Sequence, residues 1–519
     1  MRSFGKRSGA QALVEALERA GAEVVFGYPG ANIVDVYERL QKAKFRFVLG
    51  RHEQGCTHMA DGYARATGRP GVVVVTSGPG ATNAITGLAT ANVDGVPLVL
   101  VSGQVPLSQI GTDAFQEADM TGICRAATKH SFLVKSADEI PETVAQAFYI
   151  ATHGKPGAVV IDVPKNVQEE LTAAQYPERI SLRAYHPERA ATTAQVSRFA
   201  KWLNEAKRPV LFAGGGVIAA NAAKDVAALA KRANVPVATT LMGIGSFDER
   251  EPLSLGLAGL YGTRAANEAL AAADLVIALG VRFNDRVTGQ DISRSVFKAK
   301  VVHVDCDPSS IDKNVTVDLG IVADIKDLLT TVNSRVRPAE HAEWLRQVAA
   351  WKKHEVKGSD ASARRLVEAI ARATKGRAIL VADVGNHQMA CARHCAHALP
   401  RHFLTSGGMG TMGFAIPAAI GAALARPDEK VVAVVGDGGA QMTFEELIVA
   451  VELKLPVTFV VVNNSALGMV NTPIASPDFV KLARAYGVKG VRVGDPAELG
   501  AVIARAVRAK SPVLVEVRT

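Results

Sequence analysis

The chain has 519 residues, and its 48% hydrophobic content with 46 glycines is typical of an α/β enzyme. Because this length exceeds one ordinary hydrophobic core, about two to four domains are expected. Lysine and arginine number 59 against 50 aspartates and glutamates, and the resulting net charge of +9 mildly favours anionic ligands. No run of five or more basic residues occurs, which argues against nucleic acid as a partner.

Membrane and disulfide signals are weak. No apolar run reaches the roughly 18 residues of a membrane-spanning helix, and the basic start MRSFGKRSGAQ leads into no apolar signal segment. We therefore expect a soluble, cytoplasmic protein with no membrane partner. Five scattered cysteines argue against a disulfide framework. Cys391 and Cys395, near His387 and His394, leave zinc as a less favoured alternative, because no second ligand pair of matching spacing follows.

Short apolar runs that end in glycine or polar turns and lead into helical patterns recur from the start of the chain. This repetition predicts doubly wound parallel sheets. In the first block, Glu53 follows the strand predicted at 45–49 and lies between two glycine-rich turns. It fits either an acid that stabilises a helix N-terminus or a general acid/base, and the sequence alone leaves both open. The other strands predicted in this block are 24–26, 72–75 and 98–101.

We expect three α/β domains, at 1–170, 191–335 and 361–519, joined by polar or charged linkers at 171–190 and 335–360. The glycine turns at Ser77–Asn83 and Ser406–Gly413 are similar, so the first and third blocks are candidates for copies of one fold. The second turn also contains a G-x-G-x-x-G. A dinucleotide site there is a weaker alternative, because the acid near the expected distance, Asp437, belongs to a turn of its own.

The third block contains a strand (431–435), a Gly-Asp-Gly-Gly turn, a helix over Thr443–Glu452 and a second strand (457–462). This βαβ pattern places Asp437 and Asn464 at the same carboxyl edge of a parallel sheet, where ligands of open α/β folds bind. One carboxylate, one amide oxygen and backbone carbonyls suit Mg²⁺, which commonly shares its ligands with a phosphate. The glycines let backbone N–H groups approach that phosphate.

The GDG turn followed by Asn463-Asn464 resembles the thiamine diphosphate (ThDP) motif. Beyond it, nearly the whole chain resembles the catalytic large subunit of acetolactate synthase, also called acetohydroxyacid synthase. The resemblance is carried by VVFGYPGA at 24, RHEQG at 51, TSGPGATN at 76, IGTDAFQEAD at 110, TTLMGIGSF at 239, FNDRVTGQ at 283, HVDCDPSSIDKN at 303, LTSGGMGTMGFAIPAA at 404 and PDFVKLARAYG at 477.

The resemblance implies a ThDP-dependent transferase of branched-chain amino acid biosynthesis, which condenses two 2-oxo acids (two pyruvates to 2-acetolactate and CO₂). The first domain would bind the cofactor's pyrimidine, the central domain FAD, and the third the diphosphate with Mg²⁺. FAD would have no net redox role. A homodimer or homotetramer with active sites between subunits is implied, and a regulatory small subunit is possible in the family.

Residue roles carry over by position. Glu53 would bond N1′ of the aminopyrimidine and promote loss of the cofactor's C2 proton, with Gln116 as the second catalytic residue. The metal ligands would be Asp437, Asn464 and the carbonyl of Ala466. Other ThDP contacts would be Gly30, Pro79, Asn83, Gly385, His387, Gln388, Gly410, Met412, Gly436, Gly438, Gly439, Gly468 and Met469. FAD contacts would be Lys155, Gly214, Gly215, Thr240, Leu241, Met242, Arg282, Arg286, Asp305, Ile311 and Asp324; substrate contacts would be Ala31, Phe115, Lys165 and Val470.

The chain departs from the family after Val470, where only Asn471–Ser476 replaces a longer mobile segment that contains a Trp. Tyr261, Lys155 and Asn284 also differ from the residues usual in the family near FAD. Two alternatives therefore stand beside the carboligase: a ThDP-dependent 2-oxo acid decarboxylase or other lyase, and a partner subunit of low activity that binds ThDP and FAD.

Overall fold

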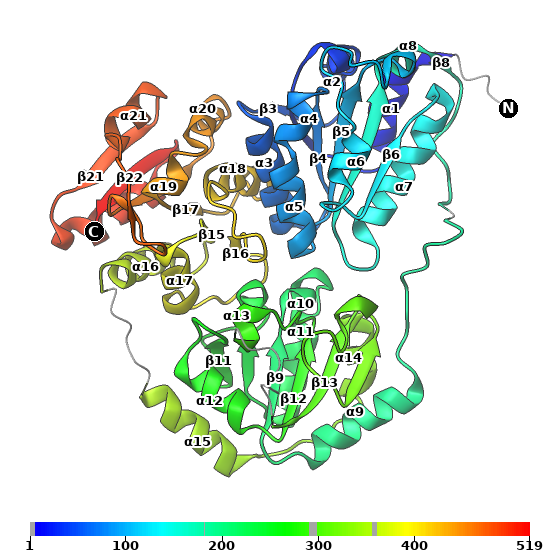
Figure 1. The fold of residues 1–519 in the computed structure, drawn as a ribbon. Helices are drawn as coiled ribbons and strands as arrows, with labels where there is room; N and C mark the ends of the chain where they lie inside the picture. The colour runs from blue at the N-terminus through cyan, green and yellow to red at the C-terminus, as the bar shows by residue number, and fades with distance from the viewer. Residues whose placement is uncertain (1–5, 181, 290–297, 355–360) are drawn as a thin grey trace. The chain divides into compact units, whose positions relative to one another are not determined.

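The computed structural model describes residues 6–180, 182–289, 298–354 and 361–519. These residues form three six-stranded parallel sheets covered by helices (Figure 1), which confirms the predicted doubly wound α/β fold. They divide into two compact units. The first comprises Met1–His186, Gly408–Val493 and Ala506–Arg518, and the second comprises Pro187–Gly407, Gly494–Arg505 and Thr519. Within the described residues, no helix is long and apolar enough to cross a membrane.

The first sheet has the strand order β3-β2-β4-β5-β7-β6. Its four inner strands, β2, β4, β5 and β7, are rich in valine and almost entirely buried, as expected of a parallel sheet between two helical layers, whereas the edge strands β3 and β6 are partly exposed. Helices α1, α2 and α7 pack on one face, and Figure 1 shows α3 and α5 on the other. The strands are β2 (Val24–Tyr28), β3 (Arg46–Leu49), β4 (Gly71–Val75), β5 (Leu98–Gln104), β6 (His130–Leu133) and β7 (Ala158–Pro164). The helices are α1 (Gly9–Arg19), α2 (Val34–Leu40), α3 (Glu53–Thr67), α4 (Pro79–Asn83), α5 (Ile85–Asp94), α6 (Met120–Cys124), α7 (Ile140–Thr152) and α8 (Lys165–Glu169).

The third sheet has the order β16-β15-β17-β18-β22-β21. When the strands of each sheet are counted along the chain, this is the same order as in the first sheet. The shared topology supports the prediction that the first and third blocks are copies of one fold. The strands are β15 (Ile379–Ala382), β16 (Phe403–Thr405), β17 (Val431–Gly436), β18 (Val457–Asn463), β21 (Lys489–Val493) and β22 (Val513–Arg518). The helices are α16 (Ala361–Thr374), α17 (Asn386–His394), α18 (Ala415–Ala425), α19 (Asp437–Ala440), α20 (Leu447–Glu452), α21 (Phe479–Ala485) and α22 (Leu499–Arg508).

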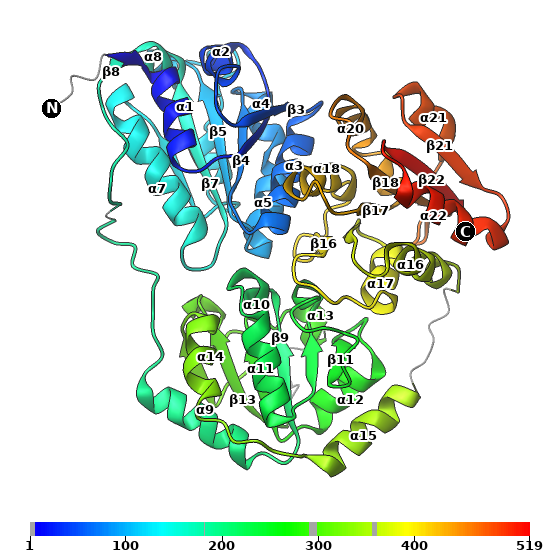
Figure 2. The same ribbon diagram turned by 180° about the vertical axis from the view of Figure 1, so that it is seen from behind.

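The central sheet has a different order, β11-β10-β9-β12-β13-β14, which is the classic order of dinucleotide-binding folds. Helices α9, α11 and α14 cover one face, and α12 and α15 cover the other (Figure 2). The strands are β9 (Pro209–Ala213), β10 (Val237–Thr239), β11 (Ser254–Leu257), β12 (Leu275–Leu279), β13 (Lys300–Asp305) and β14 (Leu319–Val322). The helices are α9 (Thr193–Glu205), α10 (Gly215–Ala219), α11 (Ala223–Ala233), α12 (Arg264–Ala272), α13 (Asp285–Thr288), α14 (Ile325–Asn333) and α15 (Ala342–Lys353).

Three segments differ from the sequence prediction. Leu171–Thr172 forms a strand, β8, paired with β1 (Arg7–Ser8), so ordered structure extends into the expected linker. The second expected linker contains α15, whose Trp344 is buried in the central core and donates its Nε1–H to the Pro209 carbonyl at 3.1 Å. The helix predicted over Thr443–Glu452 is divided into a 3₁₀ turn, η6 (Phe444–Glu446), and α20.

Within the first unit, α3 and α18 lie side by side in both views (Figures 1 and 2). Glycines allow their backbones to approach closely. A Cβ on Gly62 of α3 would lie 2.1 Å from the Ala418 carbonyl oxygen, and a Cβ on Gly421 of α18 would lie 1.8 Å from that of Met59. No side chain fits in either place, so this helix pair depends on both glycines.

We expect Gly421→Ala to destabilise the protein by roughly 1–3 kcal/mol, because the added methyl overlaps backbone that cannot move independently. The measurement is the Tm. Gly500→Ala is the matched control, because Gly500 also lies in a helix but has open space around its Cβ position. It should be neutral or stabilise by up to about 1 kcal/mol. An equal effect of the two substitutions would contradict this account of the helix crossing.

Candidate functional site

Glu53 is the first residue of α3, just beyond the carboxyl end of β3. The glycine turn after β4 lies against it. Asn83 donates its Nδ2–H to Glu53 Oε2 at 3.0 Å, and a Cβ on Gly80 would lie 3.4 Å from Glu53 Oε1. The structure thus brings together two predicted site residues from different strand ends and orients the carboxylate with a neutral donor.

Gln116 also reaches this edge of the first sheet. Its backbone has φ +63°, and a Cβ on Gly78 would lie 3.0 Å from its Cα, so Gly78 accommodates Gln116 closely. The buried side-chain oxygen of Gln116 has no hydrogen-bond partner, as expected for a group that meets a ligand. Its neighbour Phe115 is 83% exposed.

The remaining predicted residues of the first sheet lie at the same carboxyl edge. Gly30 and Ala31 follow β2, and a Cβ on Gly30 would collide with the Thr76 side chain at 2.4 Å. Lys165 begins α8 directly after β7. The geometry therefore groups the candidate pyrimidine and substrate residues where parallel sheets bind ligands.

Asp162 anchors the loop that carries Phe115 and Gln116, and the sequence analysis missed it. The buried Asp162 carboxylate accepts hydrogen bonds from Ser102 Oγ at 2.6 Å and Gln104 Nε2 at 2.9 Å, and Gln104 also donates to the Ala118 carbonyl. Burial raises the pKa of Asp162 to about 7, against the opposing effect of both hydrogen bonds. The only sequence signal was an acid within the apolar run of β7.

The predicted metal ligands lie at adjacent strand ends of the third sheet. Asp437 follows β17 and is buried, while Asn464 follows the parallel strand β18 and is exposed. Asp437 Oδ1 accepts the Gly438 N–H at 3.0 Å, and its Oδ2 accepts the Ser476 hydroxyl at 2.9 Å. Ser476, which the sequence analysis did not select, ends the short segment Asn471–Ser476.

Met412 lies beside the GDG turn. A Cβ on Gly438 would lie 3.2 Å from Met412 Cε and 2.5 Å from a Leu467 methyl, so glycine is needed there. The loop that carries Met412 is held by α5, since Gly408 N–H donates to Asp94 Oδ1 at 2.7 Å and the hydroxyls of Thr90 and Thr411 are 2.7 Å apart.

The segment after Asn464 folds back as a two-stranded antiparallel hairpin, β19 (Ala466–Leu467) with β20 (Thr472–Pro473). Its tip contains Gly468 and two exposed side chains, Met469 at 44% and Val470 at 67% exposure. The Gln441 Nε2–H donates to the Ala475 carbonyl and fixes the returning chain. The chain between Asn464 and Ser476 is therefore a compact hairpin.

In the second unit, His387 is buried near the start of α17, after β15. Gly385 has φ +152°, and a Cβ there would lie 2.6 Å from the His387 ring. Burial lowers the pKa of His387 to about 4, so the ring is neutral at pH 7, and its Nε2 has no partner. Gln388 is held by a hydrogen bond from its Nε2 to Thr405 Oγ1. In the described part of the chain, no three His, Cys, Asp or Glu side chains gather as metal ligands.

The predicted flavin residues of the central domain gather at the carboxyl ends of its strands. Gly214 and Gly215 follow β9, at the point where the strand order reverses, and a Cβ on Gly214 would lie 2.0 Å from the Gly280 carbonyl oxygen. The others follow neighbouring strands: Thr240, Leu241 and Met242 after β10, Arg282 and Arg286 after β12, Asp305 and Ile311 at or after β13, and Asp324 after β14. Lys155 belongs to the other unit.

Known proteins match the chain over nearly its whole length. Family models for thiamine pyrophosphate enzymes match residues 7–123 (N-terminal TPP binding domain), 196–332 (central domain) and 383–517 (C-terminal TPP binding domain). The acetolactate synthase large subunit of Haemophilus influenzae is 43% identical, with 95% of this chain and 91% of that protein covered. The Escherichia coli isozyme 3 large subunit is 42% identical, with 96% and 92% covered. The yeast (Saccharomyces cerevisiae) mitochondrial catalytic subunit is 41% identical, with 99% and 81% covered.

The chain belongs to the acetolactate synthase large-subunit family. Its family membership makes it a ThDP-dependent carboligase, so the residues of its motifs should suit ThDP and a metal ion. Within the first unit, the unpartnered Gln116 Oε1, the buried Asp437 carboxylate and the close approach at Gly438 fit polar cofactor groups and a metal. The donor set of Asp437, Asn464 and a carbonyl fits Mg²⁺.

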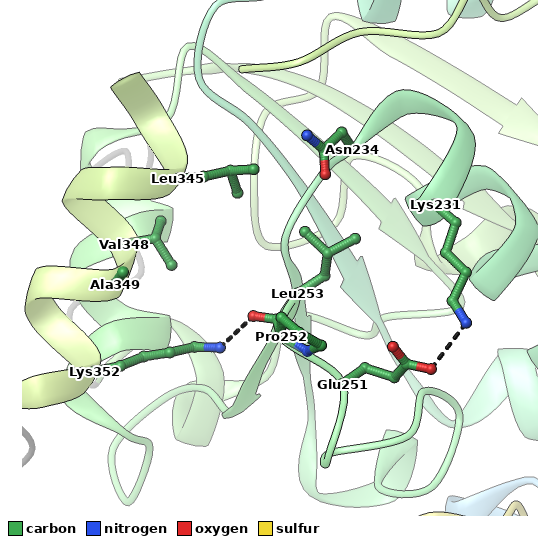
Figure 3. Close-up of a pocket in the computed structure, with 9 residues that line it drawn as sticks. All are labelled: Lys231, Asn234, Glu251, Pro252, Leu253, Leu345, Val348, Ala349 and Lys352. Atoms are coloured by element: carbon green, nitrogen blue, oxygen red, sulfur yellow. Dashed lines mark hydrogen bonds and ion pairs between the residues drawn. The ribbon is translucent and has the colours of Figure 1, made fainter. Parts of the chain in front are cut away.

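A pocket of about 420 Å³ lies elsewhere on this acetolactate synthase homologue, in the central domain (Figure 3). Its walls come from α11, α15 and the segment before β11. Lys231 pairs there with Glu251 at 2.8 Å, and Lys352 donates to the Pro252 carbonyl at 2.6 Å. The pocket lies at the amino ends of β10 and β11, opposite the edge where α/β folds bind ligands, so we do not assign it to the active site.

Asp162→Asn tests the buried carboxyl, and the Ser102 hydroxyl can turn to accept from the new amide. Because the folded-state pKa is raised, wild-type stability contributed by this group falls as pH rises from about 4 to about 7, whereas asparagine does not titrate. We therefore expect the Tm of Asp162→Asn, measured relative to wild type, to rise over this pH range. The corresponding change in the free energy of unfolding has an upper limit of about 4 kcal/mol. A pH-independent difference in Tm would contradict the assignment.

Proposed function

We propose that the chain condenses two 2-oxo acids, with two pyruvates giving 2-acetolactate and CO₂. The observation that carries the proposal is that one chain contains both the Asn83-held Glu53 carboxylate and the Asp437/Asn464 motif at adjacent strand ends. The near full-length match to acetolactate synthase large subunits supports it. The domain limits 1–170, 191–335 and 361–519 are part of this proposal, as the pyrimidine, FAD and diphosphate domains.

Mg²⁺ would be bound by Asp437, Asn464 and the Ala466 carbonyl. Gly436, Gly438, Gly439, Gly468 and Met469 would surround the diphosphate, with Gly385, His387, Gln388, Gly410 and Met412 around the rest of the cofactor. When bound, ThDP supplies the electron sink for loss of CO₂.

The chain's own groups would position the reactants and move protons. Glu53 would exchange a proton with N1′ of the pyrimidine, with Gly30, Pro79 and Asn83 holding the ring edge. Lys165 would attract the carboxylate of the 2-oxo acid, and Gln116 would donate its Nε2–H to one of the acid's oxygens. Ala31, Phe115 and Val470 would form the apolar wall that limits water near the reacting carbon.

FAD would lie at the carboxyl edge of the central sheet, on the residues grouped there. Lys155, which belongs to the other unit, stays a prediction from the resemblance alone. The classic dinucleotide-binding strand order of this sheet supports the assignment. We also propose a homodimer or homotetramer. A regulatory small subunit is an additional possible partner, because the relatives are named large subunits.

A ThDP-dependent decarboxylase is the second candidate, since the hairpin β19–β20 leaves Val470 exposed and a wetter site would let a proton quench the reactive carbon. The third, a weakly active ThDP- and FAD-binding partner subunit, is disfavoured by the presence of Glu53, Asp437 and Asn464.

We expect Glu53→Gln to lower turnover by ~10²–10⁴-fold, because it removes acid/base catalysis while keeping the shape of the side chain. The ThDP and Mg²⁺ concentrations for half-maximal activity should stay close to wild type. The matched control is Glu38→Gln, an exposed glutamate on α2 of the same domain. Unchanged turnover in Glu53→Gln would remove Glu53 from the mechanism.

The compact hairpin predicts weak discrimination between acceptors. One methylene in an apolar pocket is worth only ~1–3 kcal/mol, so a single aromatic wall can supply all of the preference for 2-oxobutanoate over pyruvate. Pro473 stands where the family's segment brings its Trp, and all three Trp of this chain (202, 344 and 351) lie outside residues 361–519. With equal concentrations of the two acids, we expect slow turnover and little excess of acetohydroxybutanoate over acetolactate. A strong excess at a rapid rate would show that another residue builds the acceptor pocket.

A further inference from the structure

Glu446 is a buried carboxyl that none of the proposed functional roles uses. It ends the 3₁₀ turn η6, which follows the GDG turn in the chain, and its side chain is fully buried. It accepts the backbone N–H of Arg51 at 3.1 Å on both oxygens and the N–H of His52 at 3.0 Å on Oε1. These two amides immediately precede Glu53.

The space around Glu446 is closed. A Cβ on Gly55 would lie 2.0 Å from Glu446 Oε1, so the first turn of α3 lies directly against the carboxyl. Burial raises the pKa of Glu446 to about 8, against the opposing effect of the two amide hydrogen bonds. The protein thus retains an acidic group where an apolar residue would leave two backbone donors unpaired.

We propose that Glu446 is a positioning residue for Glu53: by accepting the amides of Arg51 and His52, it fixes the start of α3 and so the place of the Glu53 carboxylate. Asn83 orients the Glu53 carboxylate through a hydrogen bond to its side chain. Glu446 holds the backbone that leads into Glu53. The diphosphate-binding block would thereby fix the acid/base group carried by the pyrimidine-binding block of the same chain. This inference rests on the proposed catalytic role of Glu53.

Two substitutions at position 446 separate the effect of the side chain's length from the effect of its acidic group. Glu446→Asp keeps the carboxyl group but withdraws it from the amides, whereas Glu446→Gln keeps an acceptor oxygen at the original distance. We expect Glu446→Asp to lower kcat by roughly 10- to 100-fold, because a misplacement of about 1 Å can cost that much. The ThDP and Mg²⁺ requirements should not change, and Glu446→Gln should retain most of the turnover. Glu452→Gln is the matched control, since this half-exposed glutamate of α20 pairs with the Arg51 side chain rather than with the backbone.

The decisive measurement is the effect of Glu446→Asp in a Glu53→Gln background. If Glu446 acts through Glu53, the second substitution should add almost nothing to the first. Equal losses of kcat in both backgrounds would overturn the proposal, as would a loss seen only as weaker ThDP or Mg²⁺ binding, or a greater loss in Glu446→Gln than in Glu446→Asp. If Glu53→Gln alone leaves kcat unchanged, the proposed function of Glu53 itself has failed.

Discussion

The close crossing of α3 and α18 is the constraint on which the first unit depends. α3 begins with Glu53, and α18 follows the loop that carries Gly410 and Met412. Because Gly62 and Gly421 leave no room for a side chain at the crossing, the two helices have little freedom to slide. Each helix therefore fixes the position of a site segment next to its own N-terminus.

Polar contacts around this crossing support the same segments. Arg65 of α3 pairs with Asp61 and with Asp94, and Asp94 also accepts the Gly408 N–H. Removing one partner from such a buried network leaves an uncompensated charge, which costs more than an exposed pair could. The buried Asp162 likewise ties the Gln116 loop to the sheet. Both loops that carry candidate site residues are thus held by buried acids rather than by loop sequence alone.

The features that could be predicted from the sequence are those that depend on residues close together in the chain. Asp437 and Asn464 could be placed at one sheet edge because each directly follows an apolar strand, and parallel strands end together. Glu446 could not be found this way, since its amide partners lie about 395 positions away and its spacing resembles any amphipathic helix. Gly62 and Gly421 were missed for the same reason: their role depends on a helix from another block. The segment that forms α15 was predicted to be a linker because it is rich in charged residues. Only a few of its side chains, among them Trp344 and Val348, are buried in the central core.

The central claim is that this chain joins two 2-oxo acids rather than only decarboxylating one. The most direct test follows pyruvate loss, CO₂ release and acetolactate formation together, with purified protein, ThDP, Mg²⁺ and FAD. The account predicts that two pyruvates disappear for each CO₂ and each acetolactate formed. One CO₂ per pyruvate, with acetaldehyde in place of acetolactate, would contradict it.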